Sequence, residues 1–119
     1  MIVGIDHVQL AAPAGCEAEA RAFFGGLLGL EELEKPPALA ARGGVWFRLG
    51  EQQLHVGVDS GFAPARKAHP AFRLAALADL EALAARLREV TWDDDLAGHA
   101  RFYAEDPWGN RLEFLTPRT

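Results

Sequence analysis

The chain has 119 residues, of which 50% are hydrophobic and 24% charged, with a formal net charge of −5 at pH 7. This length and composition are typical of a single globular domain that buries roughly two-thirds of its unfolded surface. The negative charge argues against nucleic-acid and anionic-membrane partners, and no apolar run reaches the roughly 18 residues of a membrane span. One cysteine, Cys16, excludes an internal disulfide and disfavours a thiolate metal site. With no basic secretion signal at the N-terminus, we expect a cytoplasmic protein.

The first half of the chain predicts a strand, a helix and three further strands. Strict alternation places Val8 and Leu10 on one face of the first strand and His7 and Gln9 on the other. Apolar residues at helical spacing predict an amphipathic helix that ends at the capping residue Gly29. We expect a strand over residues 2–11, a helix over 17–28, strands over 30–35, 45–49 and 53–58, and a loop at Pro36 and Pro37.

The second half repeats this order after a joint at residues 59–68. Its last two strands form a hairpin, because Pro107 and Gly109 in Asp106-Pro107-Trp108-Gly109-Asn110 supply the backbone angles of a tight turn. We expect a strand over residues 69–74, a helix over 79–90, strands over 91–94, 100–105 and 111–116, and His99 in an irregular surface loop. The sequence therefore predicts an α+β fold, with two pseudo-repeated βαβββ modules at about residues 1–58 and 69–119 of a single domain, 1–119.

Histidine and glutamate residues occupy matched places in the two modules. His7 and His69 each lie ten residues before the acidic residue at the start of the following helix. His55 and Glu113 stand at the same point of the last strand of their modules, in Leu54-His55-Val56 and Leu112-Glu113-Phe114. Taken singly, each histidine is more often a surface residue than a ligand, and Glu113 alone is most often exposed. The matched set favours a shared site.

Each module has one helix, which covers only one face of its sheet. The opposite faces carry polar side chains, and burying those unpaired would cost several kcal/mol, so we expect them to line a partly wet cavity. The repeat would bring His7, His55, His69 and Glu113 toward one point there. Three imidazoles and one carboxylate suit one divalent ion of Zn, Ni, Fe, Mn or Co, whereas calcium and magnesium prefer oxygen ligands.

Five segments also carry a family resemblance: Ile5-Asp6-His7-Val8, Phe24 to Leu30, Gln53-Leu54-His55-Val56, His69-Pro70-Ala71-Phe72 and Asp106 to Glu113. Together they resemble the vicinal oxygen chelate superfamily, which contains glyoxalases, bleomycin-resistance proteins and extradiol dioxygenases. The resemblance implies a cup-shaped mixed sheet with helices on its outer face, a homodimer, and a metal ion held by His7, His69 and Glu113. His55 maps onto a fourth ligand that is commonly a carboxylate in glyoxalase I, so Glu113 remains the carboxylate that could move a proton.

The expected function is a glyoxalase-like, divalent-metal-dependent enzyme that acts on a small, anionic substrate with vicinal oxygens. Whether it is an isomerase, lyase or transferase is unassigned. The substrate-binding candidates on the cavity faces are Gln9, Trp46, Arg48, Arg73, Arg101 and Tyr103. Two alternatives stay open: a metal-free, bleomycin-resistance-like protein that sequesters a ligand, and an extradiol-type dioxygenase. Metal content separates the first from an enzyme, and oxygen consumption with a catechol tests the second.

Overall fold

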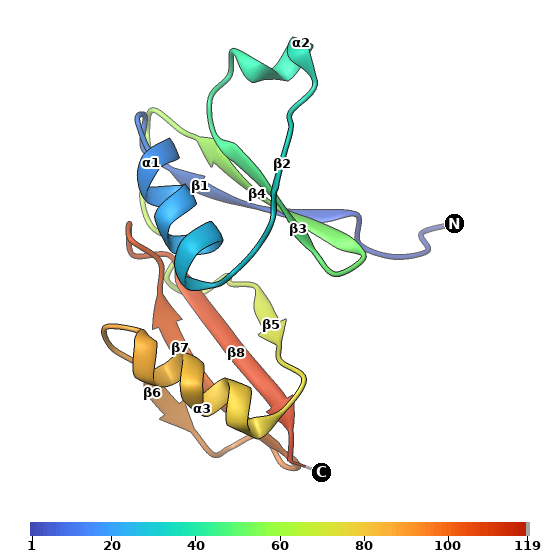
Figure 1. The fold of residues 1–119 in the computed structure, drawn as a ribbon, viewed down its shortest axis with the longest axis vertical. Helices are drawn as coiled ribbons and strands as arrows, with labels where there is room; N and C mark the ends of the chain where they lie inside the picture. The colour runs from blue at the N-terminus through green and yellow to red at the C-terminus, as the bar shows by residue number, and fades with distance from the viewer. Residues whose placement is uncertain (119) are drawn as a thin grey trace. The chain divides into compact units, whose positions relative to one another are not determined.

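The computed structural model describes residues 1–118, and the chain forms two compact units, Met1–Pro64 and Ala65–Thr119. Thr119, the last residue of the expected second module, lies outside the described residues. Each unit contains one four-stranded mixed sheet and a main helix (Figure 1). The two-module α+β fold is therefore confirmed. No helix among residues 1–118 is long and apolar enough to cross a membrane.

The first unit contains four strands in the order β1-β4-β3-β2. β1 pairs with β4 in parallel, whereas β4 with β3 and β3 with β2 are antiparallel. Leu10, Phe47, Leu54 and Val56 are buried, as expected for the apolar face. The elements are β1 (His7–Ala12), α1 (Glu17–Ala20), which continues as the π-helical turn η1 (Arg21–Leu27), β2 (Glu32–Leu33), α2 (Pro37–Ala40), β3 (Val45–Leu49) and β4 (Gln52–Val58).

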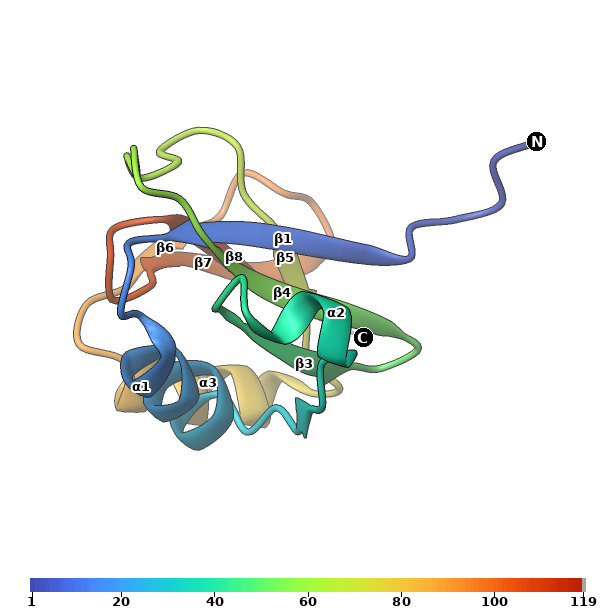
Figure 2. The same ribbon diagram turned by 90° about the horizontal axis from the view of Figure 1, so that it is seen from above.

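Three expectations for this unit were wrong in their detail. The strand expected over residues 30–35 extends only over Glu32–Leu33. The first strand begins at His7 rather than Ile2, because β4 begins at Gln52 and its ladder with β1 starts at His7. Residues before β1 run as an extended segment away from the strand (Figure 2), and Val3 is fully exposed. The loop at Pro36 contains helix α2, since Pro37 is preorganised for a first helical position. Gly29 does cap the preceding helix, with φ of 77°.

The second unit repeats this topology, with strand order β5-β8-β7-β6. Its strand β5 begins at Ala71 rather than at residue 69, so His69 precedes the strand instead of lying within it. Helix α3 begins two residues before the expected start and ends at Arg86, where Leu87 becomes extended. His99 was expected in a surface loop, but it is the half-buried first residue of β7, paired with Pro117. The elements are β5 (Ala71–Arg73), α3 (Leu77–Arg86), β6 (Thr91–Asp93), β7 (His99–Glu105) and β8 (Arg111–Pro117).

The hairpin between β7 and β8 is held by a buried carboxylate. Asp106 accepts hydrogen bonds from the backbone N–H of Trp108 at 3.0 Å and of Asn110 at 2.9 Å, and from the Asn110 side chain at 2.7 Å. Asn110 in turn accepts the Ala65 N–H at 2.9 Å. Gly109, with φ of 92°, supplies the left-handed residue that the turn requires. This network sets where β8 begins and therefore where Glu113 lies.

Candidate functional site

The first unit stacks three rings on one face of its sheet. His55 on β4 lies directly opposite Trp46 on β3 and Gln9 on β1. The Trp46 and His55 rings stack at 4.0 Å with an interplanar angle of 2°, and the His7 and His55 rings stack at 4.2 Å and 19°. His55, Trp46 and His7 therefore share the face that the alternation predicts, with His55 in the middle of the stack.

The environment of His55 favours the neutral form of its ring. The residue is 5% exposed, and its Nε2 lies 2.8 Å from Oε1 of Gln53. Burial lowers the pKa of His55 below its usual value, and the neighbouring His7 lowers it further. Because the amide oxygen is an acceptor, Nε2 donates and Nδ1 carries the lone pair. His7 is more exposed, and its Nδ1 lies 3.0 Å from Oδ2 of Asp6.

The second unit brings His69 and Glu113 together. Nδ1 of His69 lies 2.8 Å from the backbone oxygen of Lys67, and Nε2 lies 2.9 Å from Oε1 of Glu113. A carbonyl oxygen only accepts, so Nδ1 carries a proton, and Nε2 is the ring nitrogen that faces the carboxylate. Two acceptors at this distance require a proton or a metal ion between them. A backbone carbonyl that fixes the tautomer in this way is the usual support of a metal-binding histidine.

The second carboxylate oxygen of Glu113 faces a basic and aromatic cluster. Glu113 is 6% exposed, and its Oε2 accepts a long, 3.4 Å hydrogen bond from Arg101. Arg101 is held more closely by Asp93, at 3.1 Å and 3.2 Å. Tyr103, opposite Glu113 in the β7–β8 ladder, turns its ring edge-on to His69 at 5.6 Å. The Arg111 guanidinium lies 4.0 Å from the centre of the Tyr103 ring.

The remaining predicted site residues lie at the margins of these two clusters. Gln9 is exposed on β1, and Arg48 forms an exposed ion pair with Glu31 at 3.0 Å. Arg73 is exposed at the end of β5, with Leu115 as its partner in β8. Each unit thus gathers its own share of the candidates: His7, Gln9, Trp46, Arg48 and His55 in the first, and His69, Arg73, Arg101, Tyr103 and Glu113 in the second. Within either unit, considering residues 1–118, no group of three or more His, Cys, Asp or Glu side chains could hold a metal ion.

Sequence reasoning missed the partners that hold these side chains. Gln53 contacts His55, the Lys67 carbonyl sets the His69 tautomer, and Asp93 binds Arg101. Gln53 lies two residues from His55, on the same face of a strand, which was a usable signal. The contact between Asp93 and Arg101 depends on the register of β6 against β7, which the sequence does not reveal.

Comparisons with known proteins agree with this architecture. The family model described as "Glyoxalase/Bleomycin resistance protein/Dioxygenase superfamily" matches residues 4–114. A crystal structure of a putative glyoxalase family protein from Bacillus anthracis is 47% identical, covers 99% of this chain and 98% of its own, and superposes with a TM-score of 0.94. No match was found among curated proteins.

Two more distant structures share the fold. Lactoylglutathione lyase from Agrobacterium tumefaciens is 24% identical over 95% of this chain and 92% of its own, with a TM-score of 0.73. A glutamate-to-glutamine variant of the fosfomycin resistance protein FosX from Listeria monocytogenes, complexed with Mn(II) and 1S,2S-dihydroxypropylphosphonic acid, is 16% identical over 98% and 94%, with a TM-score of 0.79. From the family match over most of its length, this chain belongs to the glyoxalase, bleomycin resistance protein and dioxygenase superfamily.

Proposed function

We propose that this protein is a divalent-metal-dependent enzyme that acts on a small substrate with two adjacent oxygen atoms. His7, His69 and Glu113 would hold the ion, and His55 is the candidate for a fourth ligand. The observation that carries the proposal is the His69–Glu113 pair, in which a histidine with its tautomer fixed by the Lys67 carbonyl presents Nε2 to a carboxylate at 2.9 Å.

The donor chemistry fits such an ion. Neutral imidazole nitrogens and a carboxylate are the ligands that Zn, Ni, Fe, Mn and Co accept, and the lowered pKa of His55 favours its neutral form. In this proposal the first unit supplies His7 and the second unit supplies His69 and Glu113. The two units would belong either to one chain or to two copies of it. A bound ion would supply Lewis-acid stabilisation of negative charge on substrate oxygens.

The chain's own residues would supply the proton chemistry and the positioning. Glu113 is the carboxylate placed to take or return a proton, and Arg101 lies on its other oxygen at 3.4 Å. Asp93 keeps the Arg101 guanidinium close to that oxygen. Tyr103 limits the movement of His69 from the side. The reaction could be isomerisation, elimination or group transfer, because all three need a proton moved beside a stabilised oxyanion.

Metal content tests this proposal directly. The full chain, purified without a histidine tag or chelator, should carry about one divalent ion by mass spectrometry, whereas His7→Ala and Glu113→Gln variants should lose it. His99→Ala is the matched control, since His99 starts β7 and contacts the Ala97 carbonyl. A wild-type protein that stays metal-free after incubation with Zn²⁺, Ni²⁺, Mn²⁺ and Fe²⁺ would rule out the metalloenzyme.

A metal-free result would favour a second function, the sequestering of a flat ligand. The stack of Trp46, His55 and His7 is the observation that supports it, because planar rings bind other planar groups by stacking. Binding of a planar drug to the metal-free protein, lost in a Trp46→Ala variant, would support this alternative. Oxygen uptake with a catechol and Fe²⁺ would instead indicate a dioxygenase.

We also propose that the protein is a cytoplasmic homodimer. The segment before β1 offers exposed apolar side chains, with Ile2 93% and Val3 99% exposed, and association with a second copy would bury such side chains. Light scattering coupled to size exclusion should give twice the mass of 12.9 kDa. A monomeric mass at micromolar concentration would contradict this expectation.

A further inference from the structure

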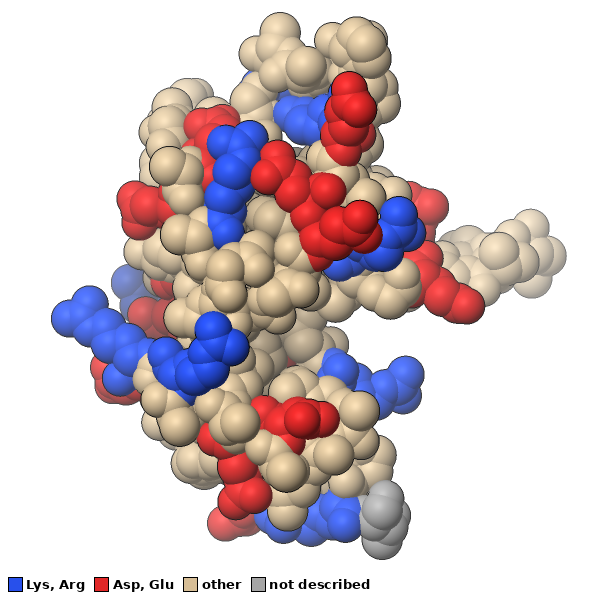
Figure 3. Space-filling view, viewed as in Figure 1, with Lys and Arg blue, Asp and Glu red and all other residues tan. Residues whose placement is uncertain are grey.

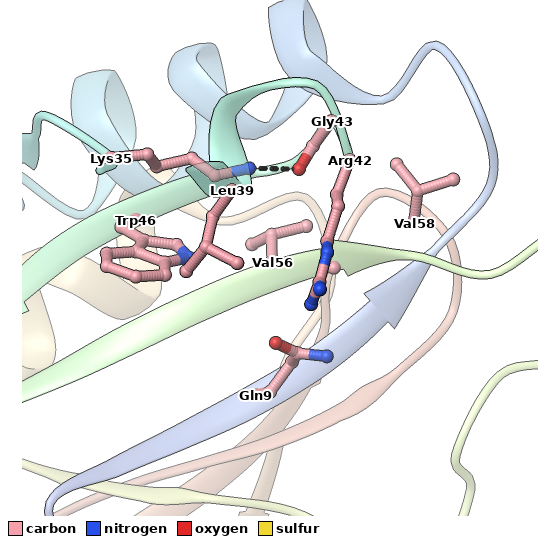
Figure 4. Close-up of a pocket in the computed structure, with 9 residues that line it drawn as sticks. Gln9, Lys35, Leu39, Arg42, Gly43, Trp46, Val56 and Val58 are labelled. Atoms are coloured by element: carbon pink, nitrogen blue, oxygen red, sulfur yellow. Dashed lines mark hydrogen bonds between the residues drawn. The ribbon is translucent and has the colours of Figure 1, made fainter. Parts of the chain in front are cut away.

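The first unit has a small hollow beside the stacked rings, between β1, β4 and the segment around helix α2 (Figure 4). Its volume is about 170 Å³, below the roughly 300 Å³ at which pockets for whole drug-sized ligands begin. It therefore fits one functional group of a larger ligand. The groups that determine its chemistry are the backbone of Gly57 and the side chains of Gln9, Lys35, Leu39, Arg42 and Trp46.

Two cations line this hollow. The Arg42 guanidinium points toward the Gln9 amide (Figure 4), and Arg42 forms no ion pair with any carboxylate of residues 1–118. The Lys35 ammonium donates one hydrogen bond to the Gly43 carbonyl and keeps two further N–H donors. Both charges therefore have donors to offer to a ligand.

Arg42 differs from the other two arginines of the first unit, Arg21 and Arg48, which both form ion pairs. Figure 3 shows basic and acidic side chains next to each other at several places on the visible face. In the same unit Arg21 pairs with Glu32 at 2.9 Å, and Arg48 pairs with Glu31 at 3.0 Å. The chain has more acidic than basic residues, 17 against 12, so a carboxylate for Arg42 was not scarce. Because Arg42 lines the hollow and has no ion pair within the described part of the chain, its guanidinium is available to bind an anion there.

The Gln9 amide lies against the bare backbone of Gly57 at the hollow. A Cβ at Gly57 would lie 2.5 Å from Nε2 of Gln9, so any side chain there would displace the Gln9 amide. Gly57 is not in the left-handed region, and a strand would ordinarily prefer a residue with a side chain here. Trp46 and Leu39 form the apolar wall, where the carbon skeleton of a ligand would lie.

We propose that this hollow binds an anionic group, a carboxylate or a phosphate-type group, of the small molecule that the protein takes. The idea rests on the proposed function and defines its substrate class. Gly57 lies two residues after His55 on β4, a step of roughly 7 Å. The hollow therefore lies beside the face of β4 that carries His55, and Arg42 and Lys35 would be the residues that select the anionic group.

Chemical-shift titration of the ¹⁵N-labelled full chain, treated with EDTA, tests the site without any metal. The probes are acetate, methylphosphonate and, as the neutral counterpart of acetate, acetamide. The two anions should shift the amides of Gly43, Gly44 and Gly57 and the Trp46 indole N–H, and acetamide should not. Comparison of acetate with methylphosphonate shows which anion class the hollow prefers.

Substitutions assign the effect to the hollow. Arg42→Gln should raise the dissociation constant at least tenfold, which is about 1.4 kcal/mol. Arg66→Gln, the matched loss of an exposed arginine in the second unit, should leave it within twofold. Gly57→Ala should also weaken binding, and its spectrum reports directly whether the chain still folds.

Three results would overturn the inference: equal shifts with acetamide, unchanged affinity in Arg42→Gln, or an equal loss in Arg66→Gln. Failure of the metal proposal gives a different pattern. Anion binding in a wild-type chain that never takes up metal would retain the anion site and refute the enzyme. A stoichiometric metal ion without anion binding would support the metalloenzyme and refute the anion site.

Discussion

The loop that carries Gly43 and Gly44 gives the sharpest prediction about stability. Gly44 has φ of 86°, and a Cβ there would lie 2.2 Å from the backbone oxygen of Val56. The left-handed conformation costs an L-residue roughly 1–2 kcal/mol. The overlap also forces the backbone to move, which lengthens the 2.7 Å hydrogen bond from the Gly44 N–H to Glu17, a charge-assisted bond worth about 1.5–3 kcal/mol. We expect Gly44→Ala to lower the free energy of unfolding by about 2.5–5 kcal/mol.

Urea unfolding followed by circular dichroism measures this change. At a slope of roughly 2 kcal/mol per molar urea, the midpoint should fall by about 2 M. Gly15→Ala is the matched control, because Gly15 has φ of 81° but nothing within 4 Å of its Cβ position. Its midpoint should fall by less than about 1 M, since only the conformational cost applies. Equal midpoints for the two variants would refute the claim that contact with Val56 determines the cost.

Three further predictions concern titration and the hairpin. Because the pKa of His55 is lowered in the folded chain, the unfolded chain takes up the proton first, so stability should fall as pH drops below about 6.5. The His55→Gln variant should flatten the dependence of the melting temperature on pH in that range, whereas His99→Gln should not. The pKa of Glu17 is lowered chiefly by the hydrogen bond from Gly44, so the stability that the Glu17 carboxylate contributes is present above pH 4.5 and is lost as pH falls further. If stability in Glu17→Gln fell with decreasing pH as steeply as in the wild type, this account would be contradicted. Asp106→Ala removes the hydrogen bonds that hold the buried turn, and in urea unfolding it should lower the free energy of unfolding by about 3 kcal/mol. A decrease below about 1 kcal/mol would show that water replaces the carboxylate.

Local pattern was enough to predict the two modules. Alternation of apolar and polar residues identifies β3 and the β7–β8 hairpin almost to the residue, because period two directly encodes the faces of a strand. It failed where an element needs a neighbour: residues 2–6 alternate as a strand does, but the β1–β4 ladder begins only at His7. Likewise, His69 lies outside β5, whose ladder with β8 begins at Ala71.

The candidate site divides in the same way. That His7, His55, His69 and Glu113 stand at matched positions follows from the sequence alone, since a repeat is visible in the spacing of its residues. The stacking of His55 between His7 and Trp46, and the tautomer of His69, were decided by tertiary structure. The register of β1, β4 and β3 produces the stack, and hydrogen bonds between distant segments set that register. The Lys67 carbonyl is only two residues from His69, but it is the path of the backbone before β5 that brings it to Nδ1.

The anion site was beyond the reach of the sequence. Arg42 lies in an irregular segment, and it meets Gln9 and Gly57 only because helix α2 and its loop close over two parallel strands. The sequence by itself determined the fold, the faces of the strands and the candidate ligands, because these depend on neighbours along the chain. Tertiary structure decided which charges are paired, which rings are buried and where space is left, because those depend on residues far apart in the chain.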